Sequence, residues 1–185
     1  MPTVIAILSI IFVIAIWVIS IQRKIEVLDE NAGNAMRQIG VQLSGRIDSL
    51  TVLVDYIRNN YVFSISIVEE ALSRRRVITA KSVPEDVLYQ ENIINDVLVK
   101  ISVFIESYPD IKTEQKYISC MDAEQTFNNM IHTSCLIYND SVAKLNHEVT
   151  VFPSSIAAKL LGYKPREYLV NKSDSVDIKQ ENLSS

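Results

Sequence analysis

Histidine and cysteine are the side chains that most often perform catalysis or bind metals, and this chain of 185 residues has two of each. Neither His132 nor His147 follows a glutamate by three residues, because those positions hold Asn129 and Lys144. The Glu-x-x-His pairs that hold di-iron centres in helical bundles are therefore absent from the sequence. Zinc-protease, disulfide-oxidoreductase, serine-hydrolase and phosphate-loop motifs are absent from it too. We expect no metal and no cofactor.

The two cysteines, Cys120 and Cys135, fall in one predicted helix. At about 1.5 Å per residue they would lie about 22 Å apart, which is too far for a disulfide bond. Cys135 is close to His132 in sequence, but a buried free cysteine is far commoner than a catalytic one that has a surface histidine nearby. Free thiols also agree with a reducing compartment. We expect no catalytic residue and no enzymatic activity.

The segment Phe152–Leu169 (FPSSIAAKLLGYKPREYL) mixes apolar and basic side chains and includes a short amphipathic helix. We predict an interaction surface within it, made of Lys159, Leu160, Lys164, Pro165, Arg166 and Tyr168. A basic amphipathic helix can lie on an anionic membrane face. It can also close the open end of a helical bundle, which is the commoner position for such a helix.

The elements that must position this motif begin with an uncharged stretch, Met1–Gln22, which is followed by Arg23-Lys24. As a helix, the part from Pro2 to Ile21 would span about 30 Å, the thickness of a hydrocarbon core. A signal peptide would have basic residues before a shorter apolar core and a small-residue cleavage site, and the sequence has neither. We expect a transmembrane anchor over residues 1–22. Because lysine and arginine stay on the cytoplasmic side, we expect the N-terminus outside and the body in the cytoplasm.

Four helical segments follow, in which apolar residues recur every three or four positions. They cover residues 25–61, 61–77, 87–107 and 114–152, with a break near Asn59 between the first two. Tyr108-Pro109 ends the third segment and Pro153 ends the fourth. In the fourth segment Glu124 and Asn128 interrupt the apolar stripe, so they either set its register or lie partly in water. These patterns predict an all-α protein.

The break near Asn59 decides where the C-terminal motif lies. If the helices alternate down, up, down, up, the fourth one returns to the membrane and brings Phe152–Leu169 there. If residues 25–77 form one helix, only three long helices alternate and the motif lies far from the bilayer. The run Arg74–Arg76 is expected to be a solvated helix end, with binding of an acidic partner or of lipid headgroups as the alternative.

Four stretches of the chain resemble signatures of the LemA family. They are Asn34–Asp48 (NAMRQIGVQLSGRID), Tyr108–Lys112 (YPDIK), Tyr138-Asn139 and Phe152–Leu169, in the family's order. The resemblance implies a bacterial protein with an N-terminal transmembrane helix and an antiparallel up-and-down four-helix bundle, here residues 23–170, with a short C-terminal amphipathic helix. No general biochemical activity is established for the family. Ser44-Gly45 stands here in place of the family's basic pair.

Charge and composition argue against some classes of function. The net charge of −4, from 18 basic and 22 acidic residues, lacks the basic excess of a nucleic-acid binder. Residues 171–185 are polar and are expected to form a disordered tail. We expect a non-enzymatic, single-pass protein of the bacterial inner membrane, acting as a scaffold or adaptor for a protein partner or for further copies of itself. The alternative is a sensory bundle that binds a small ligand. It is less favoured because no second apolar run is long enough to span a bilayer.

Overall fold

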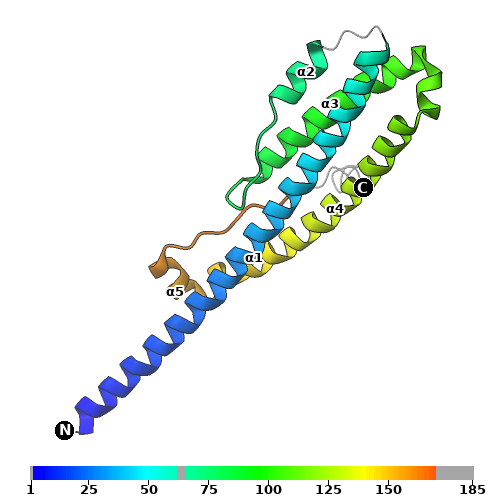
Figure 1. The fold of residues 1–185 in the computed structure, drawn as a ribbon. Coiled ribbons are helices and arrows are strands. Elements are labelled where there is room, and N and C mark those ends of the chain that lie inside the picture. The colour runs from blue at the N-terminus through cyan, green and yellow to red at the C-terminus, as the bar shows by residue number, and fades with distance from the viewer. Residues whose placement is uncertain (1, 62–65, 170–185) are drawn as a thin grey trace, which may run out of the picture.

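The computed structural model describes residues 2–61 and 66–169, in which all regular structure is helical. The elements in chain order are α1 (Pro2–Asn60), α2 (Ser66–Ser73), α3 (Pro84–Ser107), the 3-10 helix η1 (Pro109–Thr113), α4 (Gln115–Thr150) and α5 (Ser154–Leu161). Figure 1 shows α1 running the full length of the molecule, with α2, α3 and α4 alternating in direction beside its C-terminal part. The all-α up-and-down bundle is therefore confirmed, and so is the break near Asn59.

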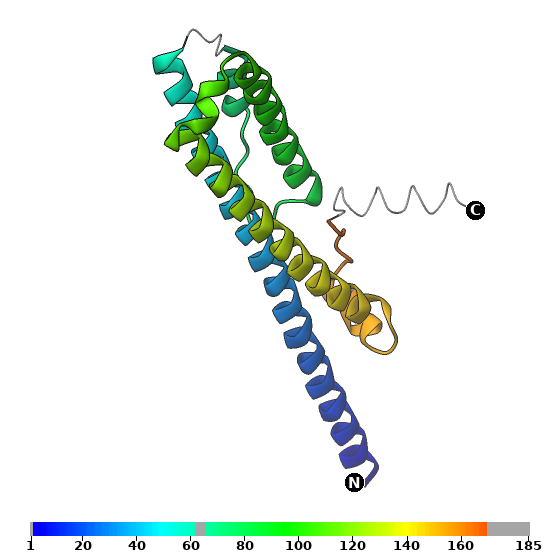
Figure 2. The same ribbon diagram turned by 90° about the vertical axis from the view of Figure 1, so that its right-hand side faces the viewer.

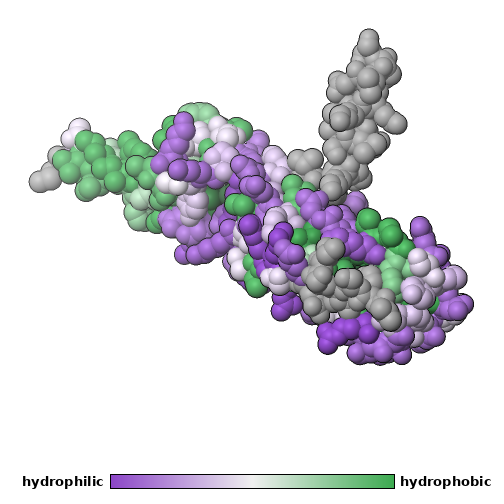
Figure 3. Space-filling view, turned by 90° about the horizontal axis from the view of Figure 1, so that it is seen from above, coloured by the Kyte–Doolittle hydropathy of each residue, from purple (hydrophilic) through white to green (hydrophobic). Residues whose placement is uncertain are grey.

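The single helix α1 has two parts with different surroundings. In residues 2–22, which we call the apolar segment, almost every side chain is exposed. From Ile25 onward, buried side chains recur every three or four positions along the same helix. Among the helices that the structure describes, only α1 is long and apolar enough to cross a membrane. In Figure 3 the apolar segment projects as a hydrophobic extension from a mainly hydrophilic body.

The bundle is built around the pair formed by α1 and α4, which lie side by side in both ribbon views (Figures 1 and 2). Within this apolar interface Arg46 of α1 and Glu124 of α4 are both more than nine-tenths buried. The Nε and Nη2 atoms of Arg46 both donate to the same carboxylate oxygen of Glu124, each at a distance of 2.9 Å. Because a buried charge must meet its partner, this pair sets the register of α4 on α1. Asn128, the second interruption of the stripe, is exposed.

A non-helical segment, residues 74–83, packs against α1 at two glycines. A Cβ atom on Gly40 would lie 2.5 Å from the carbonyl oxygen of Ile78, and one on Gly33 would lie 3.3 Å from the Cβ atom of Ala80. At Gly40 only a residue without a side chain permits so close an approach of the backbone, while at Gly33 a Cβ atom would require a shift of a few tenths of an ångström. Ile78 thereby becomes part of the main hydrophobic core.

The second helix is shorter than the predicted segment 61–77, of which residues 62–65 lie outside the described structure. α2 ends at Ser73, so Arg74–Arg76 follow the helix and do not form its last turn. The backbone N–H of Arg76 donates to Gln90 Oε1 at 2.7 Å, and the β-branched run after it disfavours helix. All three arginines are exposed, as a solvated end of the helix requires, and they form surface ion pairs with Glu70, Asp48 and Asp86 respectively.

The ends of the other helices agree with the predictions more closely. α3 begins at Pro84, three residues before the predicted start, because proline fits the first turn of a helix and Asp86 accepts a hydrogen bond from the N–H of Val83. α4 ends at Thr150, two residues before the predicted end. A left-handed Gly162, with φ of 81°, ends α5.

A second, smaller hydrophobic cluster lies where the apolar segment joins the bundle. It is made of Ile21 and Ile25 from α1, Leu145 and Val149 from α4, and Ala157 and Ala158 from α5. The helix α4 therefore returns to the end of the bundle from which the apolar segment projects. Of the two topologies considered above, the structure has the one that brings the C-terminal motif to this end.

Candidate functional site

The C-terminal motif packs against α1 through its smallest side chains. Ala157 and Ala158 of α5 are buried against Ile21 and Ile25. Beside them, Lys24 Nζ donates to Glu148 Oε1 at 2.6 Å and joins the last turns of α4 to α1. Through these two short side chains α5, a helix of eight residues, packs directly against α1 and α4 at the base of the bundle.

The larger apolar side chains of α5 and of the loop before it are exposed, whereas Leu169 at the end of the motif is buried in the main core. Ile156 and Leu160, one turn apart on α5, are 59% and 80% exposed, and Phe152 in the preceding loop is 75% exposed. We call these three residues the exposed apolar face. An amphipathic helix of a soluble bundle would normally bury its large apolar residues and expose its small ones. Here the arrangement is reversed.

After α5, residues 162–169 form a C-terminal segment that runs back up the bundle, shown in orange in Figure 1. Two asparagines of α4 hold it. The side chain of Asn146 accepts from the N–H and donates to the carbonyl oxygen of Arg166, both at 2.8 Å. Asn139 makes the same pair of bonds with Leu169, again at 2.8 Å. We call this arrangement the amide clamp.

The spacing of the amide clamp follows from backbone geometry. The two asparagines are seven residues apart, so they are separated by about 10.5 Å along a helix. Arg166 and Leu169 are three residues apart, which is about 10 Å in an extended chain. Each amide side chain therefore meets the backbone of the segment in register. The Tyr138-Asn139 signature and the C-terminal motif are thus two halves of one contact.

Two further contacts complete the attachment of the C-terminal segment. Tyr138 is buried, and its hydroxyl donates to the carbonyl oxygen of Glu167 at 3.0 Å. Burial raises the pKa of Tyr138, against the opposing effect of the Arg166 charge, so the phenol remains protonated as a donor. The Nε atom of Arg166 lies 2.8 Å from Asp29 Oδ1 on α1. The segment is therefore fixed to both long helices.

These contacts divide the predicted interaction surface. Lys159, Leu160, Lys164, Pro165 and Tyr168 are exposed, as an interaction surface requires. Arg166 is half-buried, and its side chain and backbone are occupied by Asp29 and Asn146. Phe152 and Ile156 were not part of the prediction, although they are among the most exposed apolar residues of the body. Their only signal in the sequence is that alanines, which can pack closely, occupy the other face of the helix.

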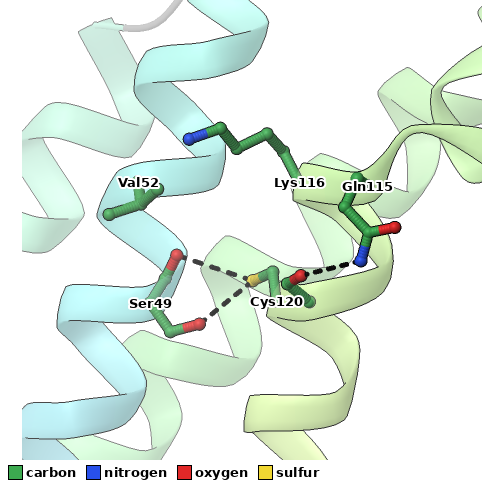
Figure 4. Close-up of a pocket in the computed structure, with 6 residues that line it drawn as sticks. Ser49, Val52, Gln115, Lys116 and Cys120 are labelled. Carbon is green, nitrogen blue, oxygen red and sulfur yellow. Dashed lines mark hydrogen bonds between the residues drawn. The ribbon is translucent and has the colours of Figure 1, made fainter.

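A shallow pocket between α1 and α4 contains Cys120, one of the two cysteines considered above as a possible nucleophile. It has a volume of about 380 Å³ and is lined by Ser49, Val52, Gln115, Lys116, Ser119 and Cys120 (Figure 4). The Ser49 hydroxyl lies 3.5 Å from the Cys120 sulfur, which in turn donates to the Ser49 carbonyl oxygen. Burial raises the pKa of the Cys120 thiol, and burial with the nearby Glu91 charge raises that of Cys135 to about 11. Both are free and buried, so this geometry disfavours a thiolate nucleophile.

Comparison with protein families places the chain in one of them. A search of the curated proteins found no match. The family model described as LemA family matches residues 35–180, which is more than three quarters of the chain. The matched region contains the buried ion pair, the amide clamp and α5. The chain belongs to the LemA family.

Proposed function

We propose that this protein is a non-enzymatic, single-pass scaffold or adaptor of a bacterial inner membrane. The apolar segment crosses the bilayer with its N-terminus outside, and the bundle lies in the cytoplasm. There it holds a partner protein, or further copies of itself, close to the membrane. Arg23 and Lys24 support this orientation because they place positive charge directly after the apolar segment.

The unbroken course of α1 is the observation that carries this proposal. One helix contributes the exposed apolar segment and, from Ile21 onward, part of the packed interior. A cut after the apolar segment, as in signal-peptide processing, would fall inside the small hydrophobic cluster. A body joined to its anchor by a continuous helix is held at the membrane without a flexible linker, and this suits a scaffold.

Photo-crosslinking in native membranes tests the partner. A photoreactive residue is placed at Val103 of α3 or Leu136 of α4, which are 60% and 55% exposed. We expect one defined product, either with another protein or with a second copy. The matched control is Ile47, which is 3% exposed and should give no intermolecular product. If the exposed positions behave like Ile47 and the protein is nevertheless recovered with membranes, the scaffold proposal is wrong.

A further inference from the structure

The exposed apolar face lies beside the end of the apolar segment. The loop between α4 and α5 and the last turns of the apolar segment line one common cavity, to which Trp17, Ile21, Phe152 and Pro153 contribute. Figures 1 and 2 agree that α5 lies at this end of the bundle. Lys24, His147 and Glu148 line the same cavity, so the apolar segment meets the loop at Phe152 across a partly polar rim, and α5 follows directly after that loop.

The charges carried by the loop and α5 themselves are basic, whereas Glu26 and Asp29 of α1 lie close to Tyr163 in the segment after α5. No acidic residue occurs from Val149 to Arg166, whereas Lys159 and Lys164 in that stretch are exposed. Arg23, at the end of the apolar segment, is exposed as well. The nearby acidic Glu148 is paired with Lys24. Apolar side chains flanked by lysines are the combination that binds the interface of an anionic bilayer.

We infer that the loop before α5 and α5 itself form a second membrane contact. Phe152, Ile156 and Leu160 enter the interfacial layer of an anionic phospholipid bilayer next to the point where the apolar segment leaves it. Lys159 and Lys164 lie among the lipid headgroups. The inference rests on the proposed membrane anchoring and adds to it, because two contacts fix the direction of the bundle whereas one allows it to tilt.

Fluorescence of the full chain in vesicles separates the two contacts. Trp17 is the only tryptophan, so its quenching by brominated lipids reports the apolar segment alone. An environment-sensitive thiol probe at Leu160→Cys reports α5, and the same probe at Val103→Cys on α3 is the exposed control. Both variants carry Cys120→Ala and Cys135→Ala, and the vesicles contain phosphatidylcholine and phosphatidylglycerol.

We expect Trp17 and the Leu160 probe to be quenched by membrane-embedded quenchers. The Leu160 probe should also show blue-shifted emission and several-fold weaker quenching by aqueous iodide than the Val103 probe. If Trp17 is quenched but iodide quenches the Leu160 and Val103 probes equally, the anchoring stands and the second contact is overturned. Absence of Trp17 quenching would overturn the anchoring, and the second contact with it.

A charge variant tests the contact with the probe at a second position. In a chain that carries the probe at Phe152→Cys, the added substitutions Ile156→Glu and Leu160→Glu should raise iodide quenching of that probe several-fold. Both residues are exposed, so helicity measured by circular dichroism should not change. Val99→Glu with Val103→Glu is the matched control, since both residues are 60% exposed on α3. Unchanged shielding at Phe152 in the first variant would overturn the inference.

Discussion

A buried ion pair helps to position α1 and α4, the two longest helices that the structure describes. Arg46 donates twice to one oxygen of Glu124, while the other oxygen, Oε1, has no hydrogen-bond partner among the described residues. Taking both charges out of water is costly, so the pair contributes less to stability than its geometry suggests. Its main effect is on the register of the two helices, because a shift of α4 along α1 would leave both charges buried and unpaired.

This asymmetry predicts the behaviour of variants. Arg46→Met should lower the free energy of unfolding by about 3–5 kcal/mol, because it leaves the Glu124 charge buried and unpaired. The double variant Arg46→Met with Glu124→Leu should recover most of that loss, since no charge is then buried. Denaturant unfolding of the full chain in detergent, followed by circular dichroism, measures both. A double variant that is as unstable as the single one would contradict this account.

The second residue-scale prediction concerns the thiols. Because burial raises the pKa of Cys135 to about 11, its neutral form predominates at every pH below that value. At pH 8 its thiolate fraction is about a hundredfold smaller than that of a thiol at the ordinary value of 9. Alkylation by iodoacetamide should therefore be slow and should accelerate steadily up to about pH 11.

The neighbouring position supplies the control for the thiol experiment. In a chain with both native cysteines replaced by alanine, Leu136→Cys places an exposed thiol one residue along the same helix. It should react at the ordinary rate. Native thiols that react as fast as this exposed one would show that the bundle opens readily around α4, contrary to the packing described here.

At the scale of elements, the amide clamp holds the C-terminal segment to α4. In Asn146→Asp one carboxylate oxygen can still accept from the N–H of Arg166, but the other faces its carbonyl oxygen, where the amide had donated. We expect the segment to be weakened by about 1–3 kcal/mol. Amide exchange in residues 162–169 should become about ten- to a hundredfold faster, as measured by hydrogen–deuterium exchange and mass spectrometry.

A conservative change elsewhere on the helix distinguishes the clamp from a general charge effect. Asn129 is exposed on α4, so Asn129→Asp adds the same charge and should leave exchange in the segment unchanged. Asn139→Asp should act mainly at Leu169, the residue that it holds. If Asn146→Asp and Asn129→Asp gave the same exchange pattern, the clamp would not be what fixes the segment.

The same elements show how far the sequence alone could predict the structure. Apolar periodicity and the prolines placed α3 and α4 within three residues of their observed ends, and Asn59 marked the end of α1 within one. The amide clamp could not be predicted in this way, because asparagines on a helix resemble a solvated face. Arg166 was assigned to a surface because its partner Asp29 is far away in sequence. The reversed orientation of α5 escaped for a related reason: periodicity favours burial of isoleucine and leucine over alanine.

At the scale of the whole molecule, α1 is both the apolar extension and the central helix of the bundle. Every contact at the base of the bundle, including the Lys24–Glu148 bond, involves this helix or the ends of α4 and α5 beside it. The direction in which this helix crosses the membrane sets the side on which the bundle lies. The proposed cytoplasmic orientation rests on the two cationic residues that follow the apolar segment, Arg23 and Lys24. Because this difference in flanking charge is small, a few substitutions should be enough to change the orientation.

Replacing Arg23 and Lys24 by glutamine and adding lysines ahead of Pro2 should invert a large fraction of the molecules, because the positive flank then precedes the apolar segment. A membrane-impermeant maleimide on Leu136→Cys, in a chain without native cysteines, measures this in intact cells. The unaltered flank should give labelling only after the membrane is opened. Lys24 also pairs with the carboxylate of Glu148, and Glu148→Gln removes that charge pairing while keeping the flanking Lys24 charge, so it should leave the orientation unchanged. Labelling of the unaltered protein in intact cells would instead place the bundle outside the cytoplasm.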